Sequence, residues 1–158
     1  MNYIRRNSSL TKLVLLAAVC LALLIAVTKR STATIGNINK SDLAGNWQMT
    51  LLGNTGCGLN SMLVTYTLNG NGVATNATIT SHDLNPTQTC PDGAVSTDNT
   101  FTINSITSTG SGTAGLTCGA GCGWTFNFQV APDRATMNVV DIAITNPNNV
   151  LVGSAIHQ

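Results

Sequence analysis

The sequence has very little charge. Lys, Arg, Asp and Glu make up 8% of its 158 residues, whereas about 25% is usual in soluble proteins. Glutamate is absent and aromatic residues make up only 4%. A chain with so few cations lacks the basic patches that bind nucleic acid, and it offers few groups for acid–base chemistry. The composition therefore argues against a nucleic-acid partner and against most kinds of enzyme.

The charge that is present is unevenly distributed. Residues 1–30 contain five of the seven basic residues, and they enclose an unbroken apolar run over 13–27. This run has the length of a signal-peptide core, and extended to residues 13–28 it approaches the length of a membrane span. We expect residues 1–30 to be a hydrophobic helix that acts as a signal peptide or, slightly favoured, as an uncleaved membrane anchor. Residues 31–42 read as a polar linker, and either alternative places the domain over 43–158 outside the cytoplasm.

From Gly45 onward, apolar and polar residues alternate with a period of two, which predicts β-strands with one buried and one solvated face. Gly-, Asn- and Pro-containing turns separate the apolar runs. The predicted strands cover 45–52, 61–69, 72–80, 100–107, 111–118, 122–130, 134–144 and 149–157.

The short connections favour antiparallel neighbours, and we therefore predict an all-β, eight-stranded up-and-down barrel, with a β-sandwich as the alternative. In such a barrel, alternate connections lie at opposite ends. The tight turns at 70–71, 108–110 and 131–133 would then form a closed end. The longer connections would meet at the other end, which we call the mouth.

Four of the five cysteines fall at the predicted mouth. In an exported domain they read first as disulfides, and we favour Cys57–Cys90 and Cys118–Cys122, although crossed pairings remain open. The alternative is a metal site formed by these thiols with His82. We expect no metal and no cofactor.

The stretch Leu43-Ala44-Gly45-Asn46-Trp47 opens the first predicted strand. Here the sequence resembles the lipocalin-like, or calycin, barrels, whose first strand begins Gly-x-Trp with the Trp closing one end. The resemblance implies that Trp47 plugs the closed end and that Arg134 packs on it, as an arginine from a late strand does in that family. The same start is similar to small bacterial periplasmic barrels that inhibit proteases.

No catalytic arrangement is recognisable. A Ser-His-Asp triad needs a histidine held by a carboxylate, but His82 and Asp83 are adjacent and would point apart, and His157 reads as a solvated tail. Asp92 and Asp98 share a loop with them and are expected to cap turns, with weak calcium binding as the alternative. We expect the protein not to be an enzyme.

The function indicated is an extracytoplasmic binding module for a small, mainly apolar ligand held inside the barrel. Asp141 either faces inward with its neighbours or lies on the surface, which we favour. The alternatives are an envelope structural or adhesive protein, for which Thr- and Asn-rich outer faces would be suitable, and a protease inhibitor that uses residues 31–42. The predicted ligand-facing residues are Met49, Leu51, Val64, Tyr66, Phe126, Phe128 and Val152.

Overall fold

The computed structural model describes residues 36–88, 90–119, 122–142 and 150–158. The predicted N-terminal helix lies outside these ranges. Within them, no helix is long and apolar enough to cross a membrane.

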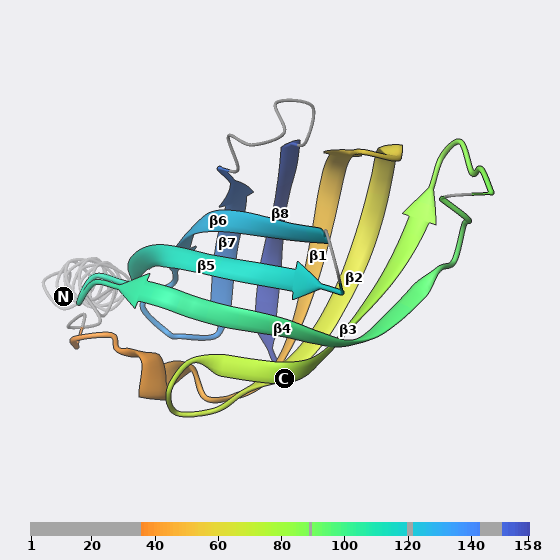
Figure 1. Ribbon diagram of the computed structural model, residues 1–158. Coiled ribbons are helices and arrows are strands. Elements are labelled where there is room, and N and C mark those ends of the chain that lie inside the picture. The colour runs from red at the N-terminus through yellow and green to blue at the C-terminus, as the bar shows by residue number, and fades with distance from the viewer. Residues whose placement is uncertain (1–35, 89, 120–121, 143–149) are drawn as a thin grey trace, which may run out of the picture. The chain divides into compact units, whose positions relative to one another are not determined.

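The eight strands form a closed antiparallel barrel in which each strand pairs with its neighbours in the sequence, and β1 also pairs with β8 (Figure 1). The predicted fold class is confirmed. In Figure 1, β4, β5 and β6 run across the direction of β1, β2 and β8. The strands are β1 (Gly45–Thr55), β2 (Gly58–Leu68), β3 (Val73–Asp83), β4 (Val95–Ile106), β5 (Ser111–Cys118), β6 (Cys122–Val130), β7 (Thr136–Asp141) and β8 (Val150–His157).

The largest departure from the predicted strands is the hairpin of β3 and β4, because β4 begins at Val95 instead of residue 100. The pairing of β3 with β4 is irregular between Ala74 and Ile79. Asn99 is buried at this irregularity and donates from Nδ2 to the carbonyl oxygens of Ala77 and Ser96, at 3.0 and 2.9 Å. A side chain thus satisfies backbone groups that a regular ladder would pair. The first four residues of β4 are all exposed, so no alternation marks this part of the strand in the sequence.

The closed end is covered by residues that precede β1. Ile38 is buried and donates its backbone N–H to Ser108 O at 3.0 Å, in the β4–β5 turn. A short 3₁₀ helix, η1 (Lys40–Leu43), then places Leu43 in the core. The described part of the predicted linker, residues 36–42, is therefore packed on the barrel. Ile38 is its one apolar side chain, which was too little to reveal this from the sequence.

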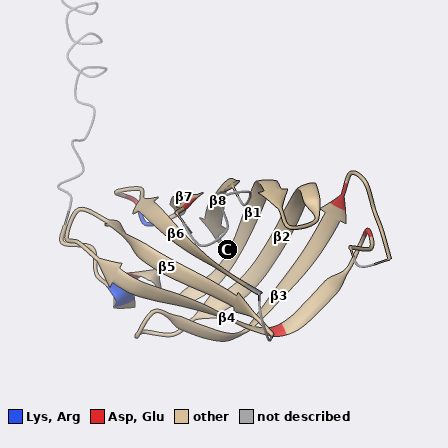
Figure 2. Ribbon diagram, turned by 45° about the horizontal axis from the view of Figure 1, so that its top comes forward, with Lys and Arg blue, Asp and Glu red and all other residues tan. Residues whose placement is uncertain are grey.

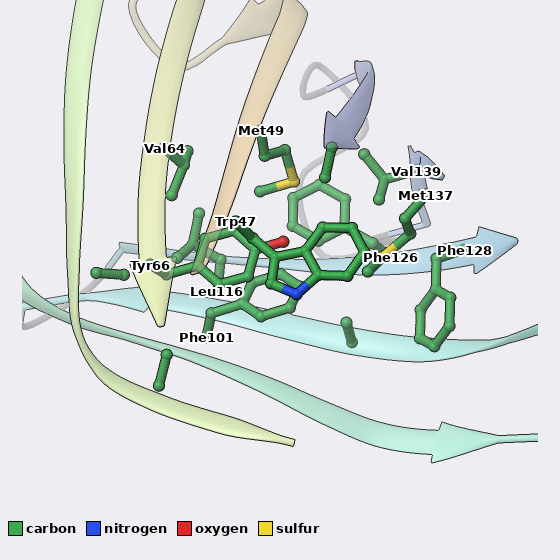
Figure 3. Packing of buried hydrophobic residues seen from close by; sticks show 14 of the residues in the cluster. Trp47, Met49, Val64, Tyr66, Phe101, Leu116, Phe126, Phe128, Met137 and Val139 are labelled. Carbon is green, nitrogen blue, oxygen red and sulfur yellow. The ribbon is translucent and has the colours of Figure 1, made fainter. Parts of the chain in front are cut away.

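Inside the barrel, buried side chains from all eight strands form one core. Trp47 and Tyr66 come from β1 and β2, while Phe101 and Phe126 come from β4 and β6, and the rings meet in the interior (Figure 3). Tyr66 and Phe101 stack with ring centroids 4.5 Å apart. The few aromatic residues are thus concentrated where burial stabilises most.

The predicted inward position of Val152 is wrong. Its side chain is 47% exposed, and the inner face of β8 is formed by Leu151 and Ala155. Val152 pairs in register with Leu52 and Val140, which also face solvent. Because β8 has apolar residues at both parities, alternation could not decide which face is buried.

A disulfide joins Cys57, in the β1–β2 turn, to Cys90, in the β3–β4 connection, with Cα atoms 5.8 Å apart and a sequence separation of 33. This predicted pair is confirmed.

Replacing both cysteines by serine is expected to lower the free energy of unfolding by about 3–4 kcal/mol, because the bond closes a long loop in the unfolded chain. Urea unfolding of the oxidised chain and of the double variant measures this. Equal midpoints and slopes would contradict it.

Candidate functional site

The mouth of the barrel carries buried polar side chains on its inner wall. Asn60 and Asp83 are 6% and 5% exposed, on β2 and β3, and Thr55 lies beside them at the end of β1. Asn60 donates from Nδ2 to Thr55 Oγ1 at 2.8 Å and to Asp83 Oδ1 at 3.3 Å. Three adjacent strands therefore present one hydrogen-bonded polar group toward the mouth, and Asp83 is part of the wall rather than of a loop.

Three buried polar atoms of inner-face residues have no hydrogen-bond partner among the described residues. They are Asn60 Oδ1 on β2, Trp124 Nε1 on β6 and Tyr66 Oη on β2. Strands β2 and β6 lie on opposite walls of an eight-stranded ring. An unpaired buried polar atom costs about 1–3 kcal/mol, so each of these atoms would gain from a ligand or water that reaches it. Burial also raises the pKa of the Tyr66 hydroxyl, so it stays protonated and able to donate.

Most of the predicted ligand-facing residues lie in the core, deeper than Asn60 and Trp124. Met49, Leu51, Val64 and Phe126 have no exposed surface. Tyr66 and Phe128 are each 4% exposed, and all six are buried as predicted. A side chain that lines an open cavity exposes some surface to a water-sized molecule. These residues therefore fill the barrel at their level.

Asp141 belongs to the inner wall, so the favoured interpretation of a surface aspartate is wrong. It pairs in register with buried Phe126 and shares a face with Met137 and Val139, which are both buried. Its parity with Met137 and Val139 was the available signal. The exposed Val140 between them made the opposite parity look apolar.

His82 and Asp92 form an exposed pair at the β3–β4 hairpin. His82 Nδ1 lies 2.6 Å from Asp92 Oδ1. The hydrogen bond from His82 lowers the pKa of Asp92, with a smaller contribution from the backbone N–H of Asp83. No serine or cysteine nucleophile is hydrogen-bonded to the histidine among the described residues. The pair holds the hairpin together but lacks the other parts of a catalytic triad.

Because folding lowers the pKa of Asp92, its contribution to stability is present above the ordinary aspartate pKa of about 3.9 and is lost as the pH falls through the lower folded value. We expect the wild-type chain to lose stability more steeply below about pH 4 than Asp92→Asn does. Thermal melts between about pH 6 and pH 2, the range in which carboxylates titrate, test this. Parallel curves would show that the pair has no part in acid stability.

The alternative of a thiol–metal site is wrong for Cys57 and Cys90, because both sulfurs are in a disulfide. Among the described residues, no group of three or more His, Cys, Asp or Glu side chains is placed to hold a metal ion. Cys118 is disulfide-bonded and pairs in register with Cys122. The side chain of Cys122 lies outside the described part, so the second predicted bond remains a prediction.

At the closed end, Trp47 is buried and donates from Nε1 to Leu43 O at 2.8 Å. The ring stacked on it belongs to His157, with centroids 4.8 Å apart and an angle of 6° between the planes. The predicted partner Arg134 instead lies with Nε 3.7 Å from Asp42 Oδ2. His157 is thus part of the plug and not a free tail, because antiparallel pairing of β8 with β1 brings it opposite Trp47.

Gly45 makes this stack possible. A Cβ atom at this position would lie 2.3 Å from His157 Nε2, and the backbone φ of +137° is one that L-residues rarely adopt.

Gly45→Ala is expected to cost about 1–3 kcal/mol of stability. In a His157→Ala background the same change should cost less, because only the backbone strain remains. A double-mutant cycle by urea unfolding measures the difference, and an equal cost in both backgrounds would contradict the clash.

Comparison with protein-family models, curated proteins and solved structures found no match. The closed eight-stranded antiparallel barrel is consistent with a lipocalin-like fold.

Proposed function

We propose that the protein is a non-catalytic, extracytoplasmic binding module that holds a small, mainly apolar ligand at the mouth of its barrel. The observation that carries this proposal is the set of unpaired polar atoms on the inner wall. Asn60 Oδ1 offers a free acceptor on one wall, and Trp124 Nε1 offers a free donor on the opposite wall. Small-molecule sites combine an apolar lining with a few such polar groups.

The surroundings of these atoms support an apolar ligand. Trp124 packs against the core cluster, and the floor below the mouth consists of side chains such as Leu51, Met62 and Leu116. Methionine is unbranched and flexible, so Met62 can adjust to a ligand that enters from above. The ligand would present an apolar body with a polar group that accepts from Trp124 Nε1 or donates to Asn60 Oδ1.

The location outside the cytoplasm is supported by the Cys57–Cys90 disulfide. Disulfides of this kind form and persist in oxidising compartments. The basic and apolar N-terminal sequence is consistent with export, as a signal peptide or as a membrane anchor. For a bacterial protein this compartment is the cell envelope or the exterior.

Native mass spectrometry of the chain purified from its own host tests for a retained ligand. Binding of 2-naphthol, an apolar ring system with one hydroxyl that both donates and accepts, is then measured by fluorescence titration. Trp124→Phe keeps an aromatic ring, although a smaller one, and removes the donor, and is expected to weaken binding by about fivefold to tenfold.

The matched control is Leu52→Ala on the outer face, where the side chain is 55% exposed. It should change the affinity by less than about twofold. If the host-purified chain is always empty and both variants bind 2-naphthol equally, the mouth is not a ligand site.

A further inference from the structure

The outer face of β4, β5 and β6 carries a hollow of about 330 Å³ that the interior ligand would not use. This volume lies at the lower end of the range of about 300–1,000 Å³ seen for ligand pockets. Apart from Leu116 and Trp124, whose side chains pack inward, its lining consists of glycine, threonine and asparagine. The lining residues are Thr100, Thr102, Asn104, Gly115, Leu116, Thr117, Gly123, Trp124 and Thr125.

The strand register explains why the surface is hollowed here. Gly115 on β5 lies between Thr102 on β4 and Thr125 on β6, so a position without a side chain is flanked by two hydroxyl groups. In the next row across the sheet, Thr100 on β4 pairs with Thr117 on β5, which pairs with Gly123 on β6. Neighbouring strands are about 4.8 Å apart, and alternate residues along one strand are about 6.7 Å apart. The threonine hydroxyls therefore surround Gly115 at regular spacings, in an arrangement that we call the hydroxyl grid.

These hydroxyl groups are available for a ligand. The side chains of Thr102 and Thr125, and that of Asn104, make no hydrogen bond within the described part of the chain. Thr117 makes one long contact, to Thr100 O at 3.4 Å. Each threonine hydroxyl offers one donor and two acceptor positions, and the asparagine amide offers both kinds.

No residue that lines the hollow is charged. Strands β5 and β6 contain no Lys, Arg, Asp or Glu, and their ribbons are tan throughout in Figure 2. The one charged residue of β4, Asp98, is not part of the lining. An anionic or cationic ligand would lose hydration here without gaining an opposite charge. A neutral ligand that carries many hydroxyl groups matches both the absence of charge and the grid of donors and acceptors.

We propose that this hollow binds an uncharged oligosaccharide along the outer face of β4–β6. The site is separate from the proposed ligand site at the mouth, since its threonines point away from the barrel interior. It would allow the barrel to attach to a neutral glycan at the cell surface or outside the cell.

Isothermal titration with three neutral probes, cellohexaose, N-acetylchitohexaose and an α-linked mannohexaose, tests the proposal. At least one probe is expected to bind with a Kd of about 1 mM or tighter. Thr102→Val combined with Thr125→Val removes two hydroxyls with little change of shape, and should weaken that binding by about tenfold or more. Thr50→Val, on the outer face of β1, is the control and should have an effect of less than about twofold.

Filling the hollow gives a second, independent test. At Gly115 an added Cβ would have Asn104 Nδ2 at 3.8 Å and Trp124 O at 3.9 Å as its nearest neighbours, which are ordinary contacts. Gly115→Thr should therefore fold normally while it blocks the floor and lowers affinity by about tenfold or more. Gly56→Thr, in a turn where a Cβ meets nothing within 4 Å, is the matched control.

Three results would overturn the proposal: no neutral probe binds, the hollow variants bind as well as the wild type, or sedimentation shows that the hollow is a contact between two copies which Gly115→Thr separates. None of these results bears on 2-naphthol binding at the mouth, because the variants lie on the opposite face of the sheet.

Discussion

The pairing of β8 with β1 is the constraint on which the rest of the structure depends. It runs from the Trp47–His157 pair to the Asn54–Val150 pair and removes the last free edges of the sheet. Once the ring is closed, the inner face of every strand is enclosed, and one modest apolar residue at every second position is enough to form a core. A chain with so few aromatic residues can therefore fold, because closure turns eight half-apolar strands into one interior.

Closure also gives the barrel two different ends. At one end, tight turns, η1 and the stacked rings of Trp47 and His157 fill the opening. At the other end, the longer connections are held by the Cys57–Cys90 disulfide, and the inner wall becomes polar at Asn60 and Asp83. The polar groups lie where the apolar packing ends, which is why a ligand site is expected at the mouth and not in the core.

The outer face is also uneven. Leu52, Val140 and Val152 form an exposed apolar row across β1, β8 and β7, because they are paired in register. Around the hollow on β4–β6 the outward residues are threonine, asparagine or glycine. Low charge thus leaves neutral surfaces of different kinds, some apolar and some rich in hydroxyl and amide groups. The hollow on β4–β6 belongs to the second kind.

The sequence by itself determined the fold class, the order of the strands and the closed end, because period-two alternation and short turns act locally and leave little choice of topology. It favoured the Cys57–Cys90 pair, which the structure then confirmed over the crossed pairings. It also placed Met49, Val64 and Phe126 in the interior. Only the tertiary structure decided the facing of Val152 and Asp141, since β7 and β8 have apolar residues at both parities and the register with β6 and β1 selects the buried one. The same holds for His157 on Trp47, for the unpaired atoms at the mouth and for the grid around Gly115. Each of these brings together residues from strands far apart in the sequence, and no local pattern encodes which of them become neighbours.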